Sequence, residues 1–102
     1  IAGGDAGFTK KMVQIFLDTM PPAVEHLKKD LHDQNWDALS KLAHKMKSTI
    51  DSMGITRLKD VIRTIEANAK HQHELDDLSK HVNKVSEVLA NCVQQLKQDF
   101  SL

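Results

Sequence analysis

The chain has 102 residues, of which 40% are hydrophobic and 27% are charged, so a single soluble domain with its own core is expected. Its 14 basic residues balance 14 acidic ones, which removes the excess of positive charge that binding to nucleic acid requires. No apolar run reaches the roughly 18 residues of a membrane span, and the single cysteine, Cys92, has no internal disulfide partner, which favours the reducing cytoplasm.

The N-terminal part combines a glycine-rich start with two short helical patterns. Three of the four glycines lie in residues 1–7, which predicts a flexible leader before a domain over residues 8–102. The missing initiator methionine favours a piece of a longer polypeptide. A first helix is expected from Phe8 to Thr19. Pro21 disfavours a helical residue before it, so the chain should bend there and restart as a second helix that ends near Leu31.

The rest of the chain predicts three longer helices. Asn35 can cap a helix over residues 36–53, which stops at Gly54 because glycine adopts the left-handed conformation most easily. A further helix begins near Ile55, and the polar stretch KHQHE forms the next turn. The last helix reaches Phe100, and its apolar residues alternate between spacings of three and four: Leu75, Leu78, Val82, Val85, Leu89, Cys92 and Leu96.

These elements predict an all-α fold, an antiparallel four-helix bundle with a short additional N-terminal helix. A long coiled-coil dimer is the structural alternative, because the last helix keeps its apolar spacing for three heptads. The breaks at MPP, HDQN, Gly54 and KHQHE favour helices that fold back on one another. The oligomeric state stays open.

One histidine, His44, lies opposite the apolar stripe of the helix over residues 36–53. At 100° per residue, Leu42 and Met46 lie about 160° and 200° away from it. The residues on the same face, within about 60° of the histidine, are Ser40, Lys41, Lys47, Ser48 and Asp51. His44 is therefore expected to point into solvent from the middle of a rigid helix.

An exposed imidazole between two lysines is suited to carry an anionic group. The neutral ring is nucleophilic near physiological pH, and lysines one turn away on either side can balance a phosphoryl charge. No carboxylate lies one turn from His44 on both sides, so self-contained hydrolysis is not expected. Exposure alone is weak evidence, because the chain has six histidines and many helix surfaces carry one by chance.

The segment AHKMKSTIDSMG, residues 43–54, resembles the phospho-accepting segment of histidine-containing phosphotransfer (HPt) domains of multistep phosphorelays. That family's pattern places a hydrophobic residue, a lysine and a glycine two, three and four positions after the histidine, and a second glycine ten positions after it. Met46, Lys47 and Gly54 match this pattern. Ser48 stands where the first glycine is usual, which predicts slower or more selective docking of a partner. In helix order, the resemblance extends over about residues 8–100.

The resemblance implies that His44 accepts a phosphoryl group from a receiver-domain aspartate and passes it to another, with Lys47 stabilising the group. The helix geometry adds Lys41 as a further source of positive charge. The residues expected to contact the partner are Ser40, Lys41, Ser48 and Asp51. The expected partners are response-regulator receiver domains, together with a histidine kinase if the parent chain is a membrane-bound hybrid sensor kinase.

No cofactor is expected on this chain, because the resemblance assigns Mg²⁺ to the receiver and the sequence has no glycine-rich phosphate loop. It should therefore be unable to phosphorylate itself from ATP. His71 and His73 point to different sides of a helix, and neither they nor His81 form a metal-binding pattern. The competing function is a helical bundle that only binds partners, either a degenerate HPt domain or an unrelated scaffold.

Overall fold

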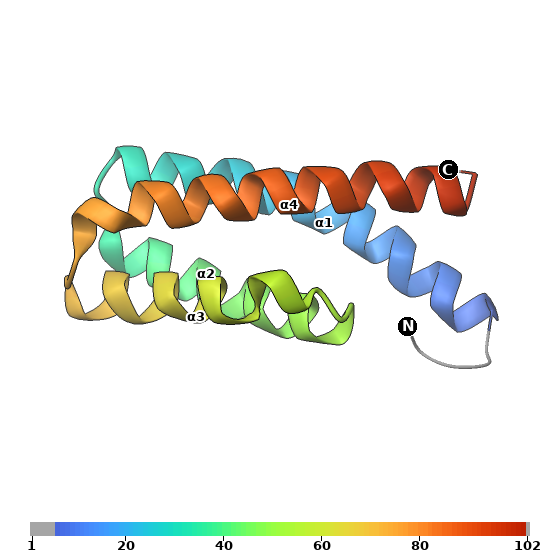
Figure 1. The fold of residues 1–102 in the computed structure, drawn as a ribbon, viewed down its shortest axis with the longest axis horizontal. Helices are drawn as coiled ribbons and strands as arrows, with labels where there is room; N and C mark the ends of the chain where they lie inside the picture. The colour runs from blue at the N-terminus through green and yellow to red at the C-terminus, as the bar shows by residue number, and fades with distance from the viewer. Residues whose placement is uncertain (1–5, 102) are drawn as a thin grey trace.

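A computed structural model describes residues 6–101, with side chains from residue 10 onward. The described part of the chain contains helices and no strand: α1 (Ala6–His32), α2 (Trp36–Ser52), α3 (Thr56–His71), the 3₁₀ turn η1 (Leu75–Asp77) and α4 (Leu78–Asp99). Consecutive long helices run in opposite directions, and α4 lies alongside α1 (Figure 1). The predicted all-α antiparallel four-helix bundle is confirmed.

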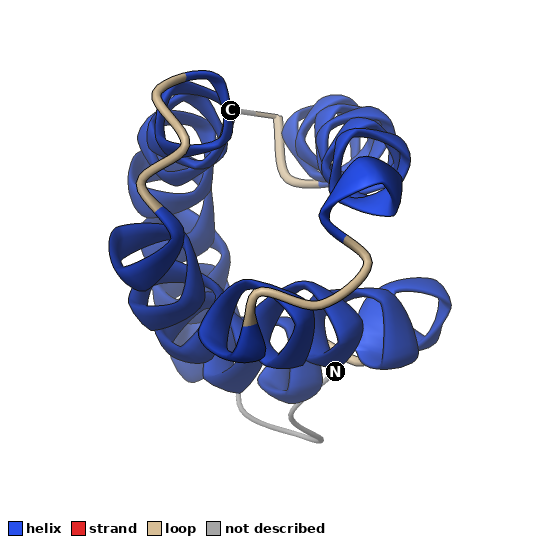
Figure 2. Cartoon of the chain, turned by 90° about the vertical axis from the view of Figure 1, so that its left-hand side faces the viewer, coloured by secondary structure: helices blue, strands red, loops and turns tan. Residues whose placement is uncertain are grey.

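The four helices surround one apolar core. Each helix packs against two neighbours, in the order α1, α2, α3, α4 and back to α1, and the end-on view shows this ring (Figure 2). The core residues that are fully buried include Leu27 from α1, Leu39, Met46 and Ile50 from α2, Leu58, Ile62 and Ile65 from α3, and Leu78, Val82 and Val85 from α4. None of the described helices is long and apolar enough to span a membrane.

The first helix differs from the sequence prediction. Instead of breaking at Pro21, α1 continues through Pro21 and Pro22, so the separate N-terminal helix and the second helix are one element. Both prolines are exposed, so the carbonyl groups that lose their helical donors lie on the solvent side, where water can bind them. On the opposite side, Phe16, Met20 and Val24 are buried in the core. Tertiary packing therefore outweighs the local cost of the prolines.

The helix ends match the prediction in part. Gly54 has a φ of +69° directly after α2, as expected for a left-handed helix stop. Asn35 precedes α2, but its side chain forms no capping hydrogen bond, which corrects the predicted cap. The KHQHE turn contains left-handed residues at Gln72 and Glu74. The predicted leader over residues 1–7 lies mainly outside the described residues, and α1 begins at Ala6.

Candidate functional site

The site is built on α2, whose two faces differ sharply. Leu39, Ala43, Met46 and Ile50 are buried in the core. His44 lies on the other face, and 66% of its side chain is exposed. Because the buried face holds the helix in place, the imidazole projects from a rigid support, as the sequence predicts.

A carboxylate from the neighbouring helix α3 contacts this histidine. Glu66 Oε2 lies 2.5 Å from His44 Nδ1, and Glu66 Oε1 lies 3.0 Å from Lys47 Nζ. A carboxylate only accepts hydrogen bonds, so the hydrogen bond places the proton of a neutral ring on Nδ1. Nε2 then carries the free lone pair and is the nucleophilic atom. Sequence reasoning missed Glu66, because it lies on a different helix, 22 positions from His44.

The electrostatic surroundings keep Glu66 ionised. The hydrogen bond from the Lys47 ammonium holds the pKa of the Glu66 carboxyl below its usual value, and the His44 ring acts in the same direction. Partial burial opposes this shift by making the charged form less favourable. Glu66 can therefore balance positive charge on the imidazole while holding Lys47 beside it.

Ser40 has a different position from the one predicted. Its side chain is buried, with a relative exposure of 8%, and its hydroxyl donates a hydrogen bond of 3.0 Å to the backbone carbonyl of Glu66. The expectation that Ser40 is exposed is therefore wrong. The hydroxyl instead joins α2 to α3 at the turn before His44 and holds the backbone of Glu66 in place.

The other predicted surface residues are exposed, and two of them form ion pairs. Lys41 lies 3.0 Å from Asp37, one turn earlier on α2. Asp51 accepts two hydrogen bonds from Arg63 of α3, at 2.6 and 3.2 Å, and this contact lowers the pKa of the Asp51 carboxyl. Ser48 is exposed one turn after His44.

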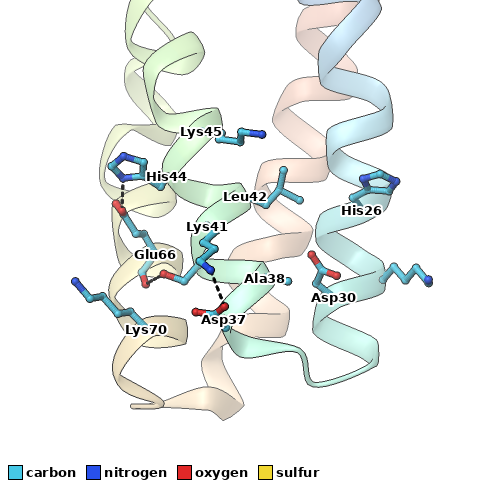
Figure 3. A pocket seen from close by; sticks show the side chains of 12 residues that line it. His26, Asp30, Asp37, Ala38, Lys41, Leu42, His44, Lys45, Glu66 and Lys70 are labelled. Carbon is cyan, nitrogen blue, oxygen red and sulfur yellow. Dashed lines mark hydrogen bonds and ion pairs between the residues drawn. The ribbon is translucent and has the colours of Figure 1, made fainter.

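An open groove runs beside His44 between α1 and α2. Its α1 side carries His26, Lys29 and Asp30, and the groove extends past His44 to Glu66 and Lys70 of α3. Figure 3 shows Lys45 projecting from α2 towards α1, Lys41 directed towards Asp37, and Leu42 between α2 and α1. The groove is thus accessible to a protein partner that approaches the free edge of the imidazole.

The structure supports no metal centre among the residues that it describes. No group of three or more His, Cys, Asp or Glu side chains lies close enough to hold an ion in this part of the chain. His71 and His73 are both exposed near the turn between α3 and α4.

Comparison with known proteins identifies the family. The model of the Hpt domain family matches residues 11–99, which include nearly all of the four-helix bundle. This chain belongs to the Hpt domain family. Membership confirms the resemblance seen in the sequence.

Similar curated proteins are signalling proteins. The phosphorelay intermediate protein YPD1 of Candida albicans is 26% identical over 73 residues, which cover 72% of this Hpt domain and 39% of YPD1. The signal transduction histidine-protein kinase BarA is 22% identical over 94 residues in both Shigella flexneri and Escherichia coli K12. That match covers 92% of the Hpt domain but only 10% of BarA, so the chain spans a small part of these relatives. No solved structure matches the chain.

Proposed function

We propose that Nε2 of His44 accepts a phosphoryl group from an aspartyl phosphate of one receiver domain and passes it to an aspartate of another. The observation that carries this proposal is the contact between Glu66 and Nδ1, because in the neutral ring it places the proton on Nδ1 and the lone pair on Nε2, on a side chain that is 66% exposed.

The transfer step needs no base on this chain. The Nε2 lone pair attacks phosphorus, the N–P bond forms, and the P–O bond to the partner's aspartate breaks, so that the aspartate leaves as a carboxylate. The Nδ1 proton stays on the ring, which becomes positively charged, and Glu66 balances that charge. Lys47 lies at the same carboxylate and supplies positive charge to the phosphoryl oxygens, with Lys41 as a further source.

The partner surface follows from the open side of His44. Glu66 covers the α3 side of the ring, so a receiver domain would approach over the groove between α1 and α2 and contact Lys41 and Ser48. Asp51 extends the exposed face by a further two turns. The lysines around the groove suit an acidic partner surface, and a receiver would bring its own Mg²⁺ in such a surface.

The setting of the parent protein is also part of the proposal. Receiver domains are the expected partners, and a histidine kinase is a further one if the parent chain carries it, as the similarity to BarA favours. We place the domain in the cytoplasm, with no cofactor of its own and no contact with nucleic acid or membrane.

The test is phosphoryl transfer from several phosphorylated receiver domains to the wild-type chain and two variants. His44→Gln should lose the acid-labile, base-stable label entirely and keep its helical circular dichroism spectrum, because the side chain is exposed. His26→Gln is the matched control, since it removes another exposed histidine of the same groove and should keep the label. A folded wild-type chain that takes no label would instead support a bundle that only binds partners.

A further inference from the structure

Ser48 has a hydroxyl group that the helix itself does not use. Three described hydroxyl groups donate to backbone carbonyls: Thr19 to Ile15, Thr64 to Asp60, and Ser40 to Glu66. Ser48 is exposed on α2, and its hydroxyl forms no hydrogen bond with any of the described residues. It is therefore free to donate to a group placed beside His44.

The orientation of the His44 ring determines where such a group would lie. The hydrogen bond from Ser40 holds the Glu66 backbone beside the turn before His44, and the Glu66 carboxylate meets Nδ1 from that side (Figure 3). The two ring nitrogens point to nearly opposite sides of an imidazole. Nε2 is therefore directed towards the following turn of α2, which carries Lys47 and Ser48.

Ser48 also leans in the right direction. Side chains on a helix point back towards its N-terminus, so a residue four positions after His44 leans over the histidine. Lys47 lies on the α3 side of the ring, where it contacts Glu66. Ser48 lies on the side that faces the open groove, as the 100° spacing of residues on α2 requires. A phosphoryl group on Nε2 would thus have the Ser48 hydroxyl on its groove side, while Lys47 Nζ is held at Glu66 beside Nδ1.

We infer that the Ser48 hydroxyl donates a hydrogen bond to a phosphoryl oxygen of phosphorylated His44. The inference rests on the proposed function, because it requires the N–P bond at Nε2. The hydroxyl keeps its proton, and no covalent bond of Ser48 changes. Since the acceptor oxygen exists beside Ser48 only after transfer, the hydrogen bond stabilises the phosphorylated state and shifts the transfer equilibrium towards this chain.

The experiment measures the equilibrium of phosphoryl transfer with the receiver domain that phosphorylates the wild-type chain fastest. Ser48→Ala and Ser48→Gly should shift the equilibrium about five- to tenfold towards the phosphorylated receiver, because both lack the donor. Ser48→Thr keeps a hydroxyl and should keep most of the wild-type value. Ser52→Ala, an exposed serine one turn further along α2, is the matched control and should leave the equilibrium unchanged.

The equilibrium separates phosphoryl binding from partner docking. A residue that only contacts the transient complex changes the forward and reverse rates by the same factor and leaves the equilibrium constant unchanged. If Ser48→Ala leaves the equilibrium constant of transfer unchanged, the inference is wrong, whether or not the forward and reverse rates change. The proposed function would remain intact. A folded wild-type chain that accepts no phosphoryl group from any receiver would overturn the proposed function and the inference with it.

Discussion

Glu66 reaches His44 from a neighbouring helix and governs which ring nitrogen is free. Its two oxygens contact Nδ1 of His44 and Nζ of Lys47. One side chain therefore orients the imidazole and holds the Lys47 ammonium beside it. Because the proposed transfer to Nε2 would give the ring a positive charge, the charge of Glu66 matters as well as its hydrogen bond. Two predictions follow from these two properties.

Glu66→Gln should slow phosphoryl transfer to His44 about five- to tenfold. The glutamine oxygen can still accept the Nδ1 hydrogen bond, but a neutral acceptor forms a weaker bond than a carboxylate and cannot balance the ring charge. Single-turnover transfer from a phosphorylated receiver measures the rate, and Glu66→Ala should lose more because it removes the acceptor altogether. A Glu66→Gln rate equal to that of the wild type would show that the negative charge has no role.

The lowered pKa of Glu66 also predicts how stability depends on pH. The carboxyl binds its proton less readily in the folded than in the unfolded chain, so ionised Glu66 stabilises the fold fully above the ordinary pKa that it has in the unfolded chain. That contribution is lost as the pH falls through the lower, folded pKa. Urea unfolding between pH 7 and 3 should therefore show a smaller loss of stability in Glu66→Gln than in the wild type. Parallel pH profiles would contradict this assignment.

Among the helices, α1 shows most clearly that tertiary packing can keep a helix continuous through residues that disfavour it. Its two interior prolines remove two backbone donors, yet the helix continues because buried residues on both sides of them join the same core. The α2–α3 pair is held in a different way, by polar contacts at its surface. Ser40, Lys47 and Asp51 of α2 bond to residues of α3, so the site and the helix register depend on the same contacts.

Replacing Pro21 by alanine should stabilise the bundle by about 1–3 kcal/mol. Alanine restores a helical donor at an exposed position and has a much higher helix propensity than proline. Chemical denaturation would measure the change, with Pro22→Ala as the companion variant. A loss of stability in both variants would show instead that α1 needs a proline-induced bend to pack against its neighbours.

The whole molecule depends on a single core that all four helices share. The ring of packed helices buries one face of each, and the site occupies the outer face of α2. A domain of this size has a total stability of only about 5–15 kcal/mol, so one core truncation removes a large fraction of it. Surface changes at the site should cost far less, which separates folding from function.

Ile62→Ala should lower the free energy of unfolding by about 2–5 kcal/mol, because Ile62 is fully buried at the centre of α3. His44→Gln, at an exposed position, should change it by less than about 0.5 kcal/mol. Urea titrations of both variants at the same pH test this contrast. A large loss in His44→Gln would mean that the histidine supports the fold, and its transfer defect would need another explanation.

The apolar spacing along the chain predicted the three helices after residue 35 and the exposure of His44, and the glycine at position 54 predicted the left-handed stop. These features depend on local periodicity and backbone conformation, which neighbouring residues determine. The motif around His44 also predicted the family correctly. The continuity of α1 was not predictable in this way, because it depends on the packing energy of residues on both sides of the prolines.

The spacing of apolar residues around His44 was enough to predict that this histidine faces solvent, opposite the buried face of α2. Only the tertiary structure decided which groups surround it: Glu66 at Nδ1, Lys47 held by the same carboxylate, and Ser40 buried against α3 instead of exposed to solvent. The physical reason is that the helical period places residues of one helix relative to each other, whereas contacts between α2 and α3 depend on how two separate helices pack.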